Sequence, residues 1–456
     1  MQKSGDGVLK GLYWFTNDLR LVDNPTLQKA TQQMDALAYV YIIEPSWFKP
    51  SRYTTKPMGE HRWRFLKQSL NDLRQQLDDK GRQLIILFAE PLQALQSLLL
   101  DQSITHVYRS DHVGWYENRT WNNLRQIRHD LNYHSIASHT LLTQTQLPFE
   151  LDDLPPHFTA FRKKVEYRHE MEQLANPAGN IKRWPQQIAL GQYDEWEALP
   201  VIHPVVDEHH SLNPVETLYG GSTQGLQHLE DYFASDQPAT YKQDRNHLDV
   251  WSHSTKFSPW LANGSLSAKR VLRRLLDYER EVVANDSTYW IYFELLWREY
   301  FQWYALKHSV RLYTLKGVNQ RTCAHCFYPE RYRKWCLGNT PYPIVNACMK
   351  QLNTTGYMSN RGRQLAASCF VNELNMDWRY GAAYFEQQLI DYDVASNWGN
   401  WQYLAGVGAD PRGKRHFDLK KQTRQYDPQQ AFIKQWQGDV FDANLDSVDA
   451  ADWPIG

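Results

Sequence analysis

The sequence predicts an α/β domain with a parallel sheet, followed by an all-α domain. Up to about residue 140, short apolar runs rich in β-branched and aromatic residues alternate with segments of helical periodicity. From about residue 220, strand-like alternation becomes rare and long helical segments dominate. A chain of 456 residues is long enough to form two or three domains with a large core.

The first domain, residues 1–140, contains four predicted strands. They are GLYWFT (11–16), LAYVYII (37–43), LIILF (84–88) and THVY (105–108), and helical spacing is found at 60–79 and 117–131. Such alternation is typical of a Rossmann-like parallel sheet. No G-x-G-x-x-G or Walker-type loop follows a strand. We therefore expect any nucleotide to bind elsewhere in the chain.

The rest of the chain divides into three parts. Residues 141–219 form a polar, proline-rich connector that is long enough to carry a helix of its own, expected at 157–172. Residues 220–436 form the helical domain, and its strongest helical patterns are 267–283, 287–308, 361–374 and 381–393. Residues 437–456 contain five Asp and no Lys or Arg, and we expect this tail to be disordered.

Composition limits the function classes. A net charge of −1 excludes a global basic field for nucleic acid but not a local basic patch. The 18 Trp and 27 Tyr indicate either a large aromatic core or stacking surfaces for a planar ligand or for bases. Five scattered cysteines are typical of a reducing compartment. With no apolar signal core and no run of transmembrane length, we expect a cytoplasmic protein without a membrane partner.

The segment STKFSPWLANGSLS, residues 254–267, has the pattern of two consecutive helix starts. Ser258 followed by Pro predicts an N-cap, Gly264 predicts the helix end, and Ser267 predicts the next N-cap. Two helix N-termini together with hydroxyl groups and Lys256 would suit a pyrophosphate. Two ordinary caps in series are the simpler interpretation of this pattern alone.

Three further groups of polar and aromatic residues predict a shared pocket. They are Glu294, Trp297 and Arg298; Asn360, Arg363 and Gln364; and Asp391, Asp393, Asn397 and Trp401.

Glu294 and Arg298 of the first group lie one helical turn apart. One interpretation is a structural pair between them, and the other is a functional Glu with a raised pKa.

Long motifs make the sequence resemble the photolyase/cryptochrome family, most closely the DASH-type cryptochromes. The resemblance extends over about residues 11–436. The motifs are WFTNDLRLVDNPTL (14–27), TYKQDRN (240–246), STKFSPWLANGSLS (254–267), STYWIYFELLWREYF (287–301), TTGYMSNRGRQ (354–364), the long segment 377–412, and KQTRQYDP (421–428).

The resemblance implies that the helical domain binds FAD. It assigns the pyrophosphate to Tyr241, Ser254, Thr255, Lys256, Phe257 and Ser258. The flavin ring is assigned to Arg363, Asp391, Asp393 and Asn397, and Arg298 is a further cofactor-binding residue. Glu117 matches an acidic contact for a folate antenna, methenyltetrahydrofolate, in the first domain.

The resemblance also implies an activity. Glu294, Trp297 and Asn360 match positions that contact a cyclobutane pyrimidine dimer, while Gln364 and Tyr403 are DASH-like choices. Trp401 and Trp378 match the inner and middle members of an electron relay. We expect light-driven repair of pyrimidine dimers, mainly in single-stranded DNA. The alternative is a blue-light photoreceptor that signals to an unknown partner without repair.

Several positions depart from the family pattern. His325 stands where most members have the outermost relay Trp, Pro341 where Gly is usual, and Asn346 where Asp is usual. Cys323 and Cys326 form a C-x-x-C with Cys336 nearby, but Cys348 is the sole candidate for a fourth ligand. We interpret this segment as a loop with free thiols and predict no metal.

A basic stretch near the end of the helical domain is a candidate DNA contact. Between Asp410 and Lys434, seven Lys or Arg stand against three Asp; the seven are Arg412, Lys414, Arg415, Lys420, Lys421, Arg424 and Lys434. They could follow the phosphates of a single strand, or simply form a solvated face.

Overall fold

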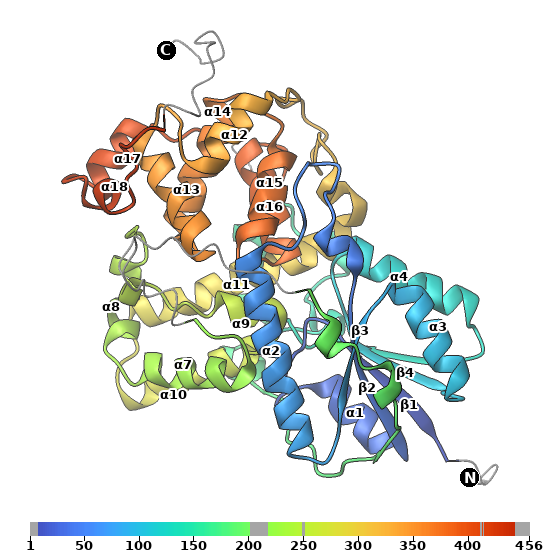
Figure 1. The fold of residues 1–456 in the computed structure, drawn as a ribbon. Helices are drawn as coiled ribbons and strands as arrows, with labels where there is room; N and C mark the ends of the chain where they lie inside the picture. Colours follow the sequence, from blue (N-terminus) through green and yellow to red (C-terminus); the bar gives the residue numbers. More distant parts are fainter. Residues whose placement is uncertain (1–7, 201–217, 249–250, 411–412, 414, 443–456) are drawn as a thin grey trace.

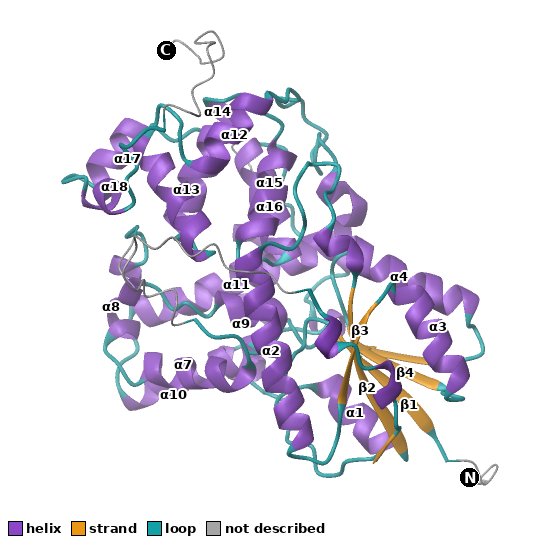
Figure 2. Cartoon of the chain, in the orientation of Figure 1, coloured by secondary structure: helices purple, strands orange, loops and turns teal. Residues whose placement is uncertain are grey.

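The computed structural model describes residues 8–200, 218–248, 251–410, 413 and 415–442. It contains an α/β domain and a helical domain that lie side by side (Figure 1). Strands are confined to the first of these, and the second consists of helices and loops (Figure 2). The predicted fold class is confirmed.

The sheet of the first domain is parallel, with the strand order β3-β2-β1-β4-β5. A short strand, β6, pairs with β2. The strands are β1 (Lys10–Phe15), β2 (Ala36–Ile43), β3 (Leu84–Phe88), β4 (His106–Ser110), β5 (Asn132–Ile136) and β6 (Gln186–Gln187). The sequence did not predict β5, because this edge strand is partly exposed and carries Asn, His and Ser.

Both faces of the sheet are covered, which explains the continuous apolar runs of β1 and β2. Successive side chains of β1 alternate between two apolar clusters: Tyr13 and Phe15 belong to one, Leu12 and Trp14 to the other. The covering helices are α1 (Pro25–Gln33), α2 (Glu60–Asp78), α3 (Pro91–Asp101) and α4 (Trp115–Ile127). Leu27 of α1 and Leu70 of α2 pack on the first face, and residues of α3 and α4 pack on the second.

The connector contributes to both cores. Its helices are α5 (Phe158–Arg168) and α6 (Met171–Leu174), beside short 3₁₀ turns at Gln144–Gln146, Leu151–Asp153, Gly191–Tyr193 and Trp196–Ala198. Phe158 and Phe161 pack into the helical domain, whereas Ile188 and Leu190 pack against the sheet. The described part of this segment therefore holds the two domains together.

The helical domain is organised around α11 (Asp286–His308), which is capped by Asn285 through the backbone N–H groups of Ser287 and Thr288. The other helices are α7 (Ser222–Phe233), α8 (Gln237–Asp244), α9 (Ser258–Asn263), α10 (Ala268–Glu281), α12 (Pro329–Leu337), α13 (Pro343–Thr355), α14 (Asn360–Asn372), α15 (Trp378–Gln388), α16 (Val394–Ala405), α17 (Leu419–Tyr426) and α18 (Ala431–Gln435). Within the described residues, we find no helix with the length and apolarity needed to span a membrane.

The motif at 14–27 is a joint between the domains. The buried Arg20 donates hydrogen bonds to the carbonyl oxygens of Gly264 (2.7 Å) and Ser138 (2.6 Å). Gly264 ends α9 with φ 72°, and a Cβ there would lie 2.0 Å from the carbonyl oxygen of Asn17. Only glycine adopts this positive φ readily and has no Cβ to clash with Asn17. The joint therefore fixes α9, and with it the loop that precedes this helix.

Residues 437–442, the first of the segment predicted to be disordered, are bonded to α13 and the residues before it. The side-chain amide of Asn346 donates to the carbonyl oxygen of Gly438 (3.1 Å), and Lys350 donates to those of Gln437 and Val440. A carboxylate could not make the Asn346 bond, because it has no N–H. Residues 443–456 lie outside the described residues.

Candidate flavin cavity and its neighbours

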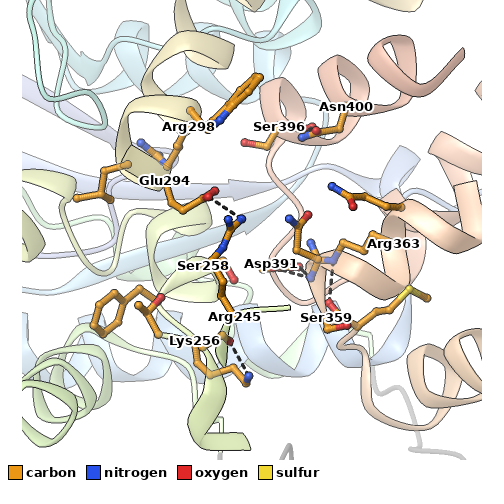
Figure 3. Close-up of a pocket in the computed structure, with 18 of the residues that line it drawn as sticks. Arg245, Lys256, Ser258, Glu294, Arg298, Ser359, Arg363, Asp391, Ser396 and Asn400 are labelled. Carbon is orange, nitrogen blue, oxygen red and sulfur yellow. Dashed lines mark hydrogen bonds and ion pairs between the residues drawn. The ribbon is translucent and has the colours of Figure 1, made fainter. Parts of the chain in front are cut away.

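A cavity of about 820 Å³ opens within the helical domain. It is lined by α8, α11, α14, α16, the loop before α9 and part of the connector (Figure 3). Its volume lies in the upper part of the range of small-molecule sites, roughly 300–1,000 Å³. Members of all three predicted groups of polar and aromatic residues line it.

One wall of the cavity is formed by residues 254–258 together with Tyr241. The Nζ of Lys256 donates to Ser254 Oγ at 2.7 Å and lies 4.8 Å from the ring centre of Tyr357. Lys256 also has a positive φ of 54°. Residues held in this region of backbone space cost free energy and cluster at ligand sites.

The predicted pair of caps is partly wrong. Ser267 caps α10 by accepting from the backbone N–H of Arg270 (3.1 Å), as expected. Ser258, however, is the first residue of α9, and Phe257 holds the cap position. Ser267 also bonds to Asp23 and faces a separate small cleft. Of the two helix starts predicted in this segment, only that of α9 therefore reaches the cavity.

A second wall comes from α11, and its Glu294 pairs with Arg245 of the segment after α8. The two side chains point toward each other with Oε1 and the guanidinium 2.6 Å apart, and the Glu294 side chain is 30% exposed (Figure 3). Burial raises the pKa of Glu294, and the positive charge of Arg245 opposes that shift. The alternative pair with Arg298 is wrong, because Arg298 donates to the carbonyl oxygens of His139 and Leu261.

Trp297 gives this wall a flat aromatic surface. Its ring stacks on Phe158 of the connector, with centroids 3.8 Å apart and planes 14° from parallel. Tyr403 of α16 contacts it edge-on at 6.1 Å. The guanidinium of Arg415 lies 4.6 Å from the ring centre of Tyr403, and Asp410 pairs with Arg415.

The opposite side of the cavity carries Arg363 and Asp391. The Arg363 guanidinium donates to both carboxylate oxygens of Asp391, at 3.0 and 2.8 Å. Asp393 accepts from the backbone N–H of Ser396 and from the Gln302 side chain. Burial disfavours the ionised form of Asp393, but the charge of Arg298 and these bonds outweigh it and lower its pKa.

The cavity brings together most of the predicted site residues. Those that line it are Tyr241, Ser254, Thr255, Lys256, Phe257, Ser258, Glu294, Trp297, Arg298, Asn360, Arg363, Gln364, Asp391, Asp393 and Tyr403. Asn397 is buried beside the cavity, and its side-chain amide donates to the carbonyl oxygen of Ala382 (2.9 Å). It is not among the lining residues.

Trp401 and Trp378 are both buried, and neither is among the residues that line the cavity. Trp401 is 2% exposed, and its ring covers Gly381 of α15, where a Cβ would lie 2.2 Å from it. Trp378 begins the same helix, one turn earlier. The indole N–H of Trp378 and the thiol of Cys323 donate to the same carbonyl oxygen, that of Leu315.

Sequence reasoning missed two residues in these surroundings. Arg245 lies within the quoted motif TYKQDRN, but nothing in the pattern pairs it with Glu294, 49 residues away. Trp398 lies with its ring centroid 5.8 Å from that of Trp378. The spacing of aromatic residues in the sequence does not reveal such a contact, because it depends on how α15 and α16 pack.

A second cavity, of about 680 Å³, lies between the sheet domain and the helical domain. Glu117 of α4 and Glu386 of α15 both line it. The Nδ1 of the buried His112 is 3.9 Å from the carboxylate of Glu117, whose side chain is 45% exposed. Burial raises the pKa of Glu386 to about 7, and the Glu117 charge adds to that shift while Arg62 opposes it.

Replacing Glu386 with Gln should change how stability depends on pH. The folded state holds the Glu386 proton more tightly than the unfolded state, so its contribution is complete below the ordinary glutamate pKa and is lost as the pH rises through about 7. The loss is on the order of 3 kcal/mol. Urea unfolding at several pH values should give a flatter stability curve for Glu386→Gln than for the exposed control Glu281→Gln. Equal slopes for the two variants would rule out titration of Glu386 in this range.

Comparison with known proteins identifies the family. The family model described as "DNA photolyase" matches residues 11–178, and the one described as "FAD binding domain of DNA photolyase" matches residues 290–449. Cryptochrome DASH of Idiomarina loihiensis is 50% identical over 98% of this chain and 96% of its own length. Cryptochrome DASH of Vibrio parahaemolyticus is 46% identical over 98% of this chain and 97% of its own length.

Solved structures agree with these matches. A cryptochrome from Synechocystis sp. superposes with a TM-score of 0.84 at 35% identity, covering 95% of this chain and 89% of that one. A class III photolyase from Agrobacterium tumefaciens gives 0.75 at 25% identity, covering 95% and 87%. The chain therefore belongs to the photolyase/cryptochrome family, with the DASH-type cryptochromes as its relatives, and its helical domain is an FAD-binding domain of that family.

Proposed function

We propose that this protein repairs cyclobutane pyrimidine dimers, mainly in single-stranded DNA, by light-driven electron transfer in the cytoplasm. The observation that carries the proposal is the convergence on one cavity of two sets of residues. One set suits a flavin nucleotide, and the other, Glu294, Trp297, Asn360 and Gln364, matches the dimer contacts of photolyases.

The residues of the cavity fit FAD. The hydroxyls of Ser254, Thr255 and Ser258 and the cation of Lys256 offer donors to a pyrophosphate along one wall. The Arg363–Asp391 pair stands on the other side, where it can lie against a flat ring. When bound, reduced and excited by blue light, FAD supplies the electron that opens the cyclobutane ring.

The remaining residues suit a lesion that has left the base stack. Trp297, held flat by its stack on Phe158, offers a wall for the flipped pyrimidines. A protonated Glu294 can donate a hydrogen bond to the carbonyl oxygens of the dimer as negative charge develops there, and burial favours that protonated form. Single strands are preferred because no base pairing opposes the extrusion of the lesion.

The departures from the family pattern lie away from the cavity. His325 and Pro341 are exposed and Asn346 is buried against Gly438, and none of the three lines the cavity. This placement favours retained repair. The alternative, a photoreceptor without repair that acts on a signalling partner, is favoured by the exposed His325 in place of a relay Trp.

Turnover separates the two functions. With a thymine-dimer oligonucleotide in large excess over protein-bound flavin, a repair enzyme should restore many dimers per flavin under continuous blue light with an external reductant. A photoreceptor without repair should restore none. A yield that stops at or below one dimer per flavin would refute catalysis.

We propose further that the second cavity holds a folate antenna. Glu117, which matches the acidic folate contact, is 45% exposed and lines this cavity together with Glu386 and aromatic side chains. Carboxylates can accept from the N–H groups of a pterin ring, and aromatic walls suit its flat shape.

The triple variant Ser254→Ala, Thr255→Ala and Ser258→Ala should lose FAD. It removes the hydroxyl donors from one wall of the cavity, and each lost hydrogen bond to a charged group costs about 1.5–3 kcal/mol. Flavin released by heat denaturation and counted per protein measures the occupancy. Ser252→Ala is the matched control, because Ser252 is exposed in the same segment and is not a lining residue. Full occupancy in the triple variant would contradict the assignment of this wall.

Arg415→Ala should weaken the binding of single-stranded DNA of any sequence. Arg415 lies at the cavity, whereas Arg412 and Lys414 of the same basic stretch lie outside the described residues. Loss of one phosphate contact lowers the salt slope of a single-strand complex by about 0.7. The measurement is fluorescence anisotropy at several salt concentrations. The exposed Lys80→Ala, in the sheet domain, should change nothing, and an unchanged slope in Arg415→Ala would exclude this contact.

A further inference from the structure

Beside the flavin cavity, the chain brings together Asp244, His247 and His253. One donor atom from each side chain lies within 4.8 Å of the other two. Asp244 ends α8, His247 follows in the next turn, and His253 ends a short 3₁₀ helix (Trp251–His253). Both histidines also line the cavity. Within the described ranges, this is the one group of three such donors that could hold a metal ion.

The hydrogen bond of His247 prepares its other nitrogen for a metal. Its Nδ1 lies 2.7 Å from the backbone carbonyl oxygen of Asp244. A carbonyl oxygen can only accept, so Nδ1 carries the proton and Nε2 keeps its lone pair. Metal-binding histidines almost always donate their second ring N–H to a carbonyl, a carboxylate or water in this way.

His253, the third member of the group, has a ring nitrogen without a hydrogen-bond partner. Its Nδ1 is buried and makes no hydrogen bond in the described structure. The two imidazole rings lie with their centroids 4.4 Å apart and their planes 51° from parallel. An unsatisfied buried nitrogen next to a second imidazole and a carboxylate is the kind of group that a bound ion explains.

The donor set selects the class of metal. Two imidazoles and one carboxylate suit zinc and its neighbours, cobalt and nickel, whereas magnesium and calcium prefer oxygen ligands alone. Ligand atoms about 2.0–2.2 Å from zinc lie roughly 3.5 Å apart in a tetrahedron. The donors therefore need to approach by about 1 Å, which is within reach of side chains in a turn.

The charges around the cluster indicate what could bind the metal beside the three protein ligands. A divalent ion bound to the Asp244 carboxylate has a single net positive charge. The nearby cations already have partners, since Lys256 bonds to Ser254 and Arg245 pairs with Glu294. Three protein ligands leave a fourth position open, as in catalytic zinc sites. We propose that Asp244, His247 and His253 bind one divalent ion of the zinc class, with its fourth position open to water or an anionic oxygen from the cavity.

This proposal revises the prediction that the chain has no metal site. That prediction considered the segment that contains Cys323 and Cys326, and no cysteine of the described residues forms a disulfide. The sequence signal lies elsewhere, in the spacing Asp-x-x-His followed six residues later by a second His. A turn and a short helix bring these residues together.

The test is calorimetric titration of the full, flavin-bearing protein with Zn²⁺ after removal of metals by a chelator. Wild type should bind one ion, and Co²⁺ in its place should show the visible absorption of a four-coordinate site. His247→Ala and His253→Ala should each weaken binding by more than the roughly 10–100-fold that loss of an outer-shell partner costs. His129→Ala, which changes an exposed histidine outside the cluster, should bind like wild type.

The double variant Cys323→Ala, Cys326→Ala tests the competing location and should also bind normally. Circular dichroism and flavin content check that each variant folds. If the histidine variants misfold, the nearly isosteric Asp244→Asn decides, and it should bind clearly more weakly. Absence of binding in wild type would overturn the proposal. Binding that survives in folded His247→Ala and His253→Ala, or that is lost with the two cysteines, would also overturn it.

Discussion

Replacing Glu294 with Ala should lower repair efficiency by roughly 10²–10³, the effect of losing one well-placed donor to a developing negative charge. Glu294 lies on the cavity wall, and burial raises its pKa although the charge of Arg245 opposes that shift. Glu294→Gln keeps a neutral donor at the same place and should retain much of the activity. The measurement is the quantum yield of dimer repair at saturating oligonucleotide.

The ion pair with Arg245 calls for a control. Removing Glu294 leaves the Arg245 charge without its carboxylate, which costs stability whether or not Glu294 acts on the dimer. Glu299→Gln is the matched variant: this carboxylate lies on the same helix, but the backbone N–H groups of Leu141 and Leu142 and the Trp303 side chain hold it away from the cavity. Glu299→Gln should lower stability but keep the repair yield per folded protein. Wild-type yield in Glu294→Ala would reduce Glu294 to a structural partner of Arg245.

Replacing Trp401 with Phe should slow photoreduction of the bound flavin by at least about one order of magnitude. Trp401 is buried against Gly381 in the helix that begins with Trp378, and the proposed electron relay runs through these two tryptophans. At the outer end of the proposed relay stands His325 in place of a Trp, and a neutral imidazole is harder to oxidise than an indole. Wild type should therefore photoreduce slowly, and His325→Trp should accelerate it.

The rate is read from bleaching of the oxidised flavin band, at about 450 nm, under blue light with a thiol donor. Trp121→Phe, a buried Trp in the sheet domain, is the control and should behave like wild type. Another aromatic residue could serve as the outer end of the relay, and Phe substitutions at Tyr328, Tyr332, Trp303 and Trp398 test this. Trp398 is included because its ring contacts that of Trp378. Fast photoreduction in wild type that none of these changes slows would contradict a block at His325.

Much of the fold and of the cavity could be predicted because the signals are local or because the motifs are long. The strands β1 and β2 are continuous apolar runs, as expected for strands buried on both faces of a sheet. The partly exposed β5 has no such run, so its sequence does not identify it as a strand. Ser267 was recognised as a cap from its own neighbourhood. Ser258 was misassigned because the backbone of Phe257, and not the serine side chain, begins the helix.

The partners of individual side chains could not be predicted. Helical spacing suggests Arg298 as the partner of Glu294. In the structure Glu294 pairs with Arg245, and Arg298 donates hydrogen bonds to the carbonyl oxygens of His139 and Leu261. Asn397, which we expect to face the flavin, donates its amide N–H to the Ala382 carbonyl oxygen, a contact that the sequence does not indicate. These contacts join residues of different elements, so no spacing along one helix encodes them.

The most direct test of the account is repair of one thymine dimer, presented in a single strand and in the matching duplex, under blue light and in the dark. A reduced, flavin-bearing protein should restore the single-stranded lesion rapidly in the light, restore the duplex lesion much more slowly, and do nothing in the dark. The strand preference follows from the energy needed to unpair and extrude the lesion, a few kcal/mol in a duplex. No repair of either substrate under light, or equal repair in the dark, would contradict the account.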